Sequence, residues 1–490
     1  MIALPEIFLQ QMQYMLQPDE FAEFCKTYQE PTVRGLRLNT LKTSNIYSEL
    51  STVPWCATGR YYTDDIRPAK SIYHHAGLFY IQEPSAMCPV EVLFFDDNKE
   101  STPDFAAPQL GLRVLDLCAA PGGKSAQIAG HLQGKGLLMS NDASPTRSRA
   151  LVKNLERMGV TNAVVTTEMP KKLSDRFPEF FDRILVDAPC SGEGMFRRDS
   201  DAVKAYTANK PDACTEMQRD ILLHAAKMLK PGGRLVYSSC TFNMKENEHM
   251  ILQFCENHPD FTPVAIDHAT LGISTGLGKL PQAGRIFPHK QTGEGHFVAL
   301  LEKGVGDGVP DIPKLPQYKI CGASRLVAHS VCCSPKRPGT PPPTETPAEL
   351  SAFLRTHLTT PIPHGVIVSH GANLYLQPEP LNLSGIRVAR SGWFLGEVAK
   401  GRFTPSHALA MGLCNQGVRF SAELSEENAA RYLRGESLDV NSVDSIFEST
   451  EFTKTSKPWV LMCYNGYPLG WAKLVQGRLK NNLPVGLVTS

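Results

Sequence analysis

The sequence predicts an α/β protein whose central sheet is mainly parallel and doubly wound, followed by smaller β-rich modules. Between residues 112 and 238, short apolar runs alternate with segments of helical periodicity. Strands separated by helices lie parallel, because each helix carries the chain back across the sheet. A glycine-rich turn follows the first apolar run, and only short β-like runs occur after residue 350. These observations place a ligand-binding α/β domain ahead of the β-rich modules.

The predicted elements of the sheet follow one another in a regular order. The runs expected to form its strands are Leu112–Leu117, Leu137–Ser140, Ile184–Val186 and Arg234–Ser238. Helical patterns cover residues 124–133, 145–158 and 215–229. In the last part of the chain the short runs expected to be strands are Gly365–Val368, Ala372–Leu376 and Trp459–Cys463, and Asn465-Gly466 predicts a hairpin turn.

Length and composition divide the chain into domains. A chain of 490 residues is too long for one hydrophobic core and suggests roughly three domains. The stretch from Gly304 to Pro347 is dense in glycine and proline, which is typical of a connector. We therefore expect an N-terminal α+β segment at 1–75, an α/β domain at 76–303, a linker at 304–349, a small β-rich module at 350–412 and a final domain at 413–490.

Composition also bears on compartment and partners. Thirteen cysteines, an odd number without framework spacing, indicate reduced thiols and a cytoplasmic protein. No C-x-x-C pair occurs, so a metal site is not expected. No apolar run approaches the length of a membrane span, and the first residues lack the pattern of a secretory signal. Because the net charge is only +1, a nucleic acid would have to be held by local patches.

The first predicted strand ends at Asp116 and leads into a turn of small residues and a helix start. Such a turn lets backbone N–H groups approach a ligand closely. Cys118 stands where a P-loop requires glycine, and the dinucleotide pattern G-x-G-x-x-G is absent. The stretch resembles the first motif of S-adenosylmethionine-dependent methyltransferases. The residues expected to contact that cofactor are Cys118, Ala119, Ala120, Pro121, Gly122, Gly123 and Lys124.

A second acid strengthens the cofactor prediction. Asp142 ends the next strand, about 20 residues further on, where doubly wound folds place the carboxylate that binds ribose hydroxyls. The alternative is a tight turn that joins a strand to a helix and binds nothing. The second acid makes this alternative less favourable.

Two further strand ends carry thiols, Cys190 in Asp187-Ala-Pro-Cys190 and Cys240 after Leu235–Ser239. This combination suits methylation of carbon 5 of cytosine, which is too weak a nucleophile to react unaided. A thiolate that adds to carbon 6 makes carbon 5 reactive. An acid hydrogen-bonded to ring nitrogen 3 would stabilise the developing charge. A second group must then help to release the product.

The three motifs together are specific. Leu115–Lys124, Asp187–Gly194 and Tyr237–Phe242 resemble successive motifs of the Sun-type RNA (cytosine-carbon-5) methyltransferases. The resemblance extends over about residues 30–303 and implies a Rossmann-like catalytic core. The β-rich tail resembles that of the bacterial RsmF/YebU-like branch, which ends in a PUA-like RNA-binding domain.

The resemblance implies a role for each site residue. Cys240 would be the nucleophile, Cys190 would assist release, and Asp187 would contact cytosine nitrogen 3. Lys124 would serve the catalytic site as well as the cofactor. Asp142 and Asp187 would contact the cofactor, and Glu168 would stand in for an aspartate of many relatives. DNA cytosine methyltransferases instead attack with the Pro-Cys thiol, which would make Cys190 the nucleophile.

The same resemblance implies RNA as the partner. Arg37 and Arg285 lie inside matched motifs, and we expect both to contact RNA, together with the N-terminal segment. The predicted substrate is small-subunit ribosomal RNA or the assembling 30S subunit, and the protein is expected to act as a monomer without a membrane partner. Transfer RNA is an alternative substrate. A different class of function is a non-catalytic ribosome-assembly factor that has kept the fold.

Overall fold

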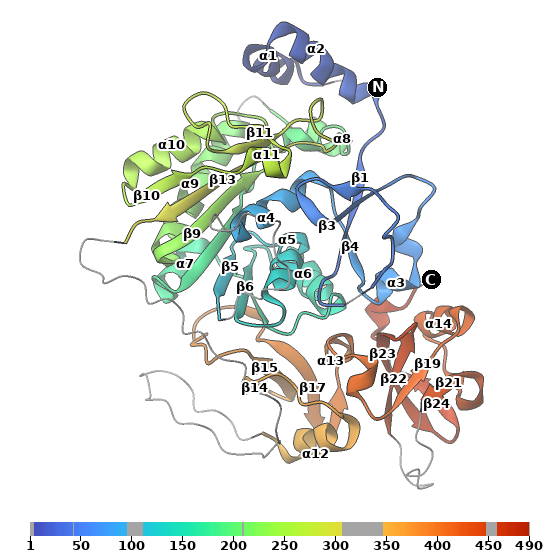
Figure 1. Cartoon of the computed structure of the whole chain (residues 1–490). Helices are drawn as coiled ribbons and strands as arrows, with labels where there is room; N and C mark the ends of the chain where they lie inside the picture. Colours follow the sequence, from blue (N-terminus) through green and yellow to red (C-terminus); the bar gives the residue numbers. More distant parts are fainter. Residues whose placement is uncertain are drawn as a thin grey trace.

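The computed structural model describes residues 4–42, 44–95, 111–207, 210–305, 346–446 and 458–489. Four regions follow one another along the chain: an N-terminal region, a central α/β domain and two C-terminal modules (Figure 1). Most of the linker predicted at 304–349 lies outside the described residues. None of the described helices is both long and apolar enough to cross a membrane.

The central domain is built on a ten-stranded sheet with the order β11-β12-β13-β9-β8-β5-β6-β7-β16, and β10 pairs with β13. Its parallel strands are β5 (Arg113–Asp116), β6 (Leu137–Asn141), β7 (Ala163–Thr166), β8 (Phe181–Asp187) and β9 (Leu229–Ser239). Antiparallel strands extend one side: β10 (Phe261–Val264), β11 (Ser274–Thr275), β12 (Gly284–Ile286) and β13 (His296–Lys303). The predicted α/β fold is confirmed.

Helices cover both faces of this sheet because both faces of each central strand are apolar. Val114 and Leu138 pack with α5 (Gly123–Leu132) and α6 (Pro145–Arg157). The next residues along each strand, Leu115 and Met139, pack on the other face. The helices of that second face are α7 (Pro170–Arg176), α9 (Lys210–Met228) and α10 (Glu248–Asn257).

The N-terminal region combines helices with a four-stranded sheet of order β2-β3-β1-β4. Its elements are α1 (Glu6–Met15), α2 (Pro18–Lys26), β1 (Arg34–Leu38), β2 (Thr52–Val53), β3 (Cys56–Tyr62), α3 (Ile72–His75), β4 (Phe79–Ile81) and α4 (Cys88–Phe94). Because β4 pairs with β1, this sheet continues past the boundary expected at residue 75. The helix α1 reaches the central domain, where Gln11 donates to the carboxylate of Glu193.

Two β-rich modules follow, as the sequence predicts. The first holds α12 (Ala348–His357), β14 (Val366–His370), β15 (Asn373–Gln377), β17 (Trp393–Ala399), β18 (Arg402–Pro405) and α13 (His407–Met411). The second is a six-stranded sheet with one helix, α14 (Glu426–Leu433), and its strands are β19 (Ser421–Glu423), β20 (Leu438–Asp439), β21 (Asp444–Ile446), β22 (Trp459–Tyr464), β23 (Tyr467–Val475) and β24 (Arg478–Asn481).

One strand of the first module belongs to the central sheet. The strand β16 (Val388–Arg390) pairs antiparallel with β7 and covers its edge. Just before β16, the backbone N–H of Arg387 donates to Glu168 at 2.7 Å, and Thr167 donates to the carbonyl of Arg387 at 2.8 Å. The C-terminal part is therefore joined to the central sheet by backbone pairing.

This pairing predicts that removal of residues 304–490 destabilises the central domain. The truncated chain would expose the edge of β7 and uncover the buried carboxylate of Glu168. We expect its thermal midpoint to fall by roughly 5–10 °C, because each kcal/mol shifts the midpoint of a domain of this size by about 2–4 °C. Calorimetry of the two chains checks this, and equal midpoints would contradict it.

Candidate active site

The carboxyl ends of β5, β6, β8 and β9 meet at one edge of the sheet because these strands are parallel. Asp116 ends β5, Asp142 follows β6, Asp187 ends β8 and Cys240 follows β9. Residues that are far apart in the sequence are thereby brought to a single edge. This juxtaposition agrees with the sequence prediction.

The loop after β5 forms a cradle at the start of α5. Gly122 has φ of 110°, a conformation that strains residues with a Cβ, and an added Cβ would lie 3.0 Å from Leu151. Ser125 Oγ donates to Asp116 Oδ2 at 2.6 Å. Asp116 Oδ1 is buried and has no hydrogen-bond partner among the described residues. Burial raises the pKa of Asp116 to about 7. This oxygen suits a ligand that carries a hydrogen-bond donor.

Asp142 is held beside this loop. Its Oδ1 accepts from the N–H of Ser144 at 2.9 Å and its Oδ2 from the N–H of Ala120 at 3.3 Å. Arg147 lies 3.5 Å from Oδ2. The structure therefore places Asp142 next to the residues predicted to bind the cofactor, as expected of a carboxylate that binds ribose hydroxyls. Within the loop, burial and then Asp116 raise the pKa of the Cys118 thiol, so Cys118 is neutral.

The two thiols predicted to carry the chemistry lie against each other. Cys190 Sγ and Cys240 Sγ are 3.3 Å apart, with both side chains partly buried. Backbone and side-chain hydrogen bonds join their loops, since Gly194 N donates to Cys240 O at 2.9 Å and the hydroxyls of Ser191 and Thr241 are 2.7 Å apart. The thiol pair is therefore a fixed feature of the fold.

The hydrogen bond with Cys240, and then burial, raise the pKa of the Cys190 thiol well above its usual range. The raised pKa favours the protonated form of Cys190. A sulfur that retains its proton is a poor nucleophile. The roles expected of the two thiols from the sequence stay predictions.

Asp187 stands beside the thiols and is surrounded by donors. Lys124 Nζ donates to Asp187 Oδ2 at 2.8 Å, and Ser238 Oγ donates to Oδ1 at 2.8 Å. Burial by itself would raise the pKa of Asp187, but Lys124 and then His296 outweigh burial and hold that pKa below its usual range. Asp187 is therefore an ionised acceptor. The predicted contact of Asp187 with cytosine nitrogen 3 stays a prediction.

His296, at the start of β13, was not predicted from sequence. Its Nε2 is buried, has no hydrogen-bond partner among the described residues and lies 3.7 Å from Asp187 Oδ1. Burial lowers the pKa of His296, so the imidazole is neutral. The motif Gly295–Ala299 was matched in the sequence, but only the fold directs this side chain toward Asp187.

Two buried carboxylates behind the thiol loops were also missed. Glu246 accepts from the N–H and hydroxyl of Ser191 at 2.9 and 2.5 Å, and burial raises the pKa of Glu246 to about 7. Glu193 accepts from the hydroxyl of Tyr206 at 2.9 Å and from Phe242 N at 3.1 Å. Both acids fix the loop that carries Cys190. Their position next to the matched motifs was the only signal in the sequence.

Glu168, the predicted substitute for an aspartate that contacts the cofactor, is engaged elsewhere. Its carboxylate accepts from Lys172 Nζ at 2.7 Å and from Arg387 N at 2.7 Å. These bonds tie the end of β7 to the C-terminal part. The predicted cofactor contact of Glu168 stays a prediction.

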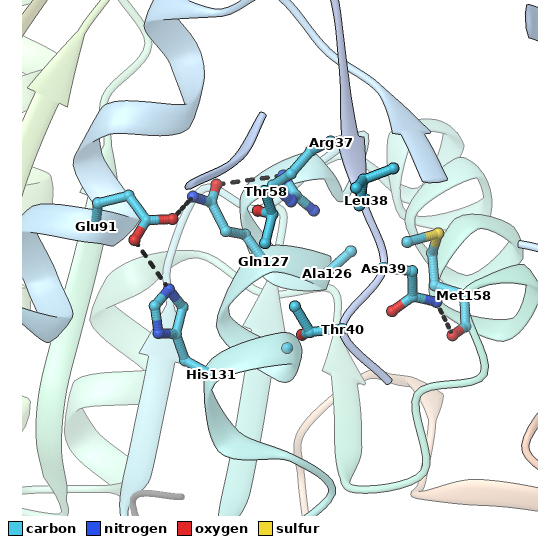
Figure 2. A pocket seen from close by; sticks show the side chains of 11 residues that line it. Arg37, Leu38, Asn39, Thr40, Thr58, Glu91, Ala126, Gln127, His131 and Met158 are labelled. Atoms are coloured by element: carbon cyan, nitrogen blue, oxygen red, sulfur yellow. Dashed lines mark hydrogen bonds and ion pairs between the residues drawn. The ribbon is translucent and has the colours of Figure 1, made fainter. Parts of the chain in front are cut away.

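The predicted RNA contact of Arg37 is corrected by its burial. Arg37 is 2% exposed and donates to Gln82 and to Gln127, the latter at 3.2 Å. Figure 2 shows the network continuing from Gln127 to Glu91, whose carboxylate accepts from Gln127 at 2.7 Å. His131 lies 3.4 Å from that carboxylate. Arg37 therefore joins β1 to α5, and its buried guanidinium cannot reach a phosphate.

The predicted RNA contact of Arg285 is also corrected by burial. It is 1% exposed, and its Nε and Nη2 donate to the two carboxylate oxygens of Glu248 at 2.6 and 2.5 Å. Its Nη1 donates to the carbonyl of Phe242, two residues after Cys240. Arg285 supports the loop of the second thiol from within the core.

No group of three or more histidine, cysteine, aspartate or glutamate side chains is arranged to hold a metal ion in the part of the chain that the structure describes. The loop after β5 and its neighbours have the groups that a bound cofactor would need. The unpartnered Asp116 oxygen, the cradle at Gly122 and the carboxylate of Asp142 fit a polar ligand with hydroxyl groups.

Comparison with known proteins assigns the family. Residues 105–302 match the model of 16S rRNA methyltransferase RsmB/F, and residues 4–84 match the N-terminal domain of RsmF. Residues 352–413 match the first C-terminal domain of RsmF, and residues 419–489 match its PUA domain. The ribosomal RNA small subunit methyltransferase F of Erwinia tasmaniensis is 33% identical over 99% of this chain and 97% of its own length. The chain belongs to the RsmF family of 16S rRNA methyltransferases.

Other similarities agree with RsmF membership. The ribosomal RNA small subunit methyltransferase F of Escherichia coli is 31% identical over 99% of this chain and 97% of its own length. A methyltransferase homologue from Pyrococcus horikoshii has a solved structure that matches 62% of this chain and 96% of its own, with 26% identity and a TM-score of 0.51. The predicted family, the methyltransferase fold and the PUA-like domain are confirmed.

The burial of Arg285 predicts a structural role that stability measurements can detect. Arg285→Met would leave the carboxylate of Glu248 buried without its cation, which costs about 3–5 kcal/mol. Unfolding in urea measures the loss, and Arg198→Met, which changes an exposed arginine, should stay within about 0.5 kcal/mol of the wild type. An Arg285→Met protein of unchanged stability would contradict the assignment.

Proposed function

We propose that this protein methylates carbon 5 of a cytosine in small-subunit ribosomal RNA, using S-adenosylmethionine and a transient covalent bond to Cys240. The observation that carries the proposal is the pair of thiols 3.3 Å apart beside the ionised Asp187. Methylation at nitrogen or ribose oxygen needs no thiol. Family membership and the names of the relatives support ribosomal RNA as the substrate.

The cofactor would be held by the loop from Cys118 to Lys124 and by Asp142. The positive φ of Gly122 shapes the turn at the start of α5, and Asp142 would accept from ribose hydroxyls. Asp116 Oδ1 would accept from a donor that the described residues do not provide. When bound, S-adenosylmethionine supplies an electrophilic methyl group for carbon 5.

Cys240 is the group that adds to carbon 6 of the cytosine. The raised pKa of Cys190 favours its protonated form, and a protonated sulfur is the poorer nucleophile, which supports Cys240 as the attacking group. The Cys240 thiol gives its proton to solvent, and its sulfur forms a bond to carbon 6. The electron pair of the carbon 5–carbon 6 double bond moves toward carbon 5, which becomes nucleophilic. The unpaired or flipped cytosine required for this attack enters at the carboxyl edge of the sheet.

Asp187 and Lys124 position the ring. The ionised carboxylate of Asp187 accepts from the exocyclic amino group and from nitrogen 3 when that nitrogen carries a proton. The ammonium of Lys124 lies 2.8 Å from Asp187 and is the donor that can stabilise charge at the ring during attack. His296 and Ser238 hold the carboxylate from the opposite side.

Cys190 completes the reaction. Once carbon 5 carries the methyl group, its proton passes to solvent, the carbon–hydrogen electron pair re-forms the double bond, and Cys240 leaves carbon 6 as a thiolate. The thiol of Cys190, 3.3 Å from the departing sulfur, can give it a proton and regain one from solvent. Without this group the covalent adduct should persist.

Substitution of each thiol tests the proposed roles. We expect Cys240→Ser to abolish both methylation and a denaturation-resistant protein–RNA adduct, because the hydroxyl is a far weaker nucleophile. Cys190→Ala should form the adduct and accumulate it. Gel analysis with cofactor and small-subunit RNA reads both outcomes. The reverse pattern would assign the attack to Cys190, and normal methylation by Cys240→Ser would refute the proposal.

The charge of Asp187 predicts a pH dependence. The lowered pKa keeps Asp187 ionised throughout the neutral range, so activity that needs the carboxylate is lost only as the pH falls through that low pKa. Lys124→Met removes the neighbouring cation and should move the acid limb of kcat/KM upward by about 1–3 pH units. His296→Gln, the matched control, should move it less. An unshifted acid limb in Lys124→Met would contradict the role of this ion pair.

A further inference from the structure

A row of basic side chains runs along α6, with Arg149 and Lys153 exposed and Arg157 half-buried at its end. Arg149, Lys153 and Arg157 are spaced four residues apart, which places them on one side of the helix over about 12 Å. Within the described ranges, none of the three forms an ion pair with a carboxylate; Lys153 donates to the carbonyl of Gly486 and Arg157 to His74, both at 2.8 Å. Like charges at this spacing weaken a helix, so the row does not serve the stability of α6.

A cavity of about 200 Å³ opens at the end of this row, between α6 and the PUA domain. Lys153, Arg157, His75 and His407 contribute its polar wall, and the one carboxylate residue in its lining is Glu156. The rest of the wall is apolar and is formed by Leu433, Leu469, Leu483, Pro484 and Leu487. Three separate parts of the chain therefore bring cationic or cation-capable groups to one cavity.

Two of these groups have polar atoms that nothing in the described part of the chain satisfies. Arg157 Nε and His407 Nδ1 are both buried without a hydrogen-bond partner. Burial, and then Arg157 and Lys153, lower the pKa of His75. Burial and Arg157 also lower the pKa of the nearby Lys42 to about 7. The cavity thus combines the charged side chains of Lys153 and Arg157 with polar atoms that have no partner among the described residues, which favours an anion.

We propose that the α6 row and this cavity bind the sugar–phosphate backbone of the RNA substrate between the catalytic and PUA domains. Three charges spread over about 12 Å suit a polyanion rather than one small anion. The helix α6 also lies against the candidate active site. Its N-cap residue, Ser144, donates to Asp142, and Asn154 donates to the carbonyl of Pro121 in the loop after β5 at 2.8 Å. Figure 1 shows α6 between the central sheet and the C-terminal modules.

The experiment compares two double variants of the full chain. Arg149→Gln with Lys153→Gln removes two charges from the row, whereas Lys171→Gln with Lys227→Gln removes two exposed charges from α7 and α9 on the opposite face of the sheet. With small-subunit ribosomal RNA as the probe, we expect the first variant to bind about tenfold more weakly. Its slope of log affinity against log salt should fall by about 1.4, since each phosphate contact to a single strand contributes about 0.7. The second variant should bind like the wild type.

The proposal rests on RNA as the substrate but not on the chemistry. Binding is therefore measured without methyl transfer, so a failure of the cytosine chemistry leaves this test intact. Lys153→Gln alone should weaken RNA binding, whereas Lys153→Arg, which keeps the charge, should bind RNA like the wild type. The thermal midpoint and the cofactor affinity should be unchanged in all variants. Wild-type affinity and salt slope in the first double variant would overturn the proposal, as would an equal loss in both double variants. Competition by millimolar inorganic phosphate as effective as that by RNA would also overturn it, because it would indicate a small-anion site.

Discussion

The ion pair between Lys124 and Asp187 is the contact on which the rest of the site depends. It joins the first turn of α5, which follows the cofactor loop, to the end of β8, which leads into the loop of Cys190. The residues that we propose to bind cofactor and substrate are thereby fixed to each other by one charge-assisted hydrogen bond. The same ion pair keeps Asp187 ionised in a position where burial would otherwise favour the neutral acid. Asp187 can therefore act as an acceptor toward the base.

The two thiols are similar residues in different surroundings. Cys190 and Cys240 both follow strand ends, and their sulfurs lie 3.3 Å apart. The neighbouring sulfur, and then burial, raise the pKa of Cys190. Glu246 and Glu193 hold the intervening loops from behind, so the distance between the sulfurs is set by buried hydrogen bonds.

Several arginines that lie inside matched motifs support the site from within. Arg37 connects β1 to α5 through Gln127, and Arg285 holds the loop of Cys240 through Glu248. Both arginines are buried. The motif match therefore identified two structurally important residues, but it did not show whether they contact RNA or stabilise the core. On the far edge of the sheet, Arg387 and β16 join the first C-terminal module to β7. The exposed cations that we propose to bind phosphate, Arg149 and Lys153, lie on α6, which no motif in the sequence marked.

The sequence by itself determined four of the five parallel strands, the strand ends that carry Asp116, Asp187 and Cys240, and the family; it did not mark β7. The features it determined depend on local periodicity and on motif spacing, both of which can be read along the chain. Only the tertiary structure decided that the two sulfurs lie 3.3 Å apart, that the pKa of Asp187 is lowered, and that Arg37 and Arg285 are buried. Protonation and exposure are set by neighbours that are distant in sequence, such as Lys124 for Asp187 and Glu248 for Arg285, and these neighbours meet only when the chain folds.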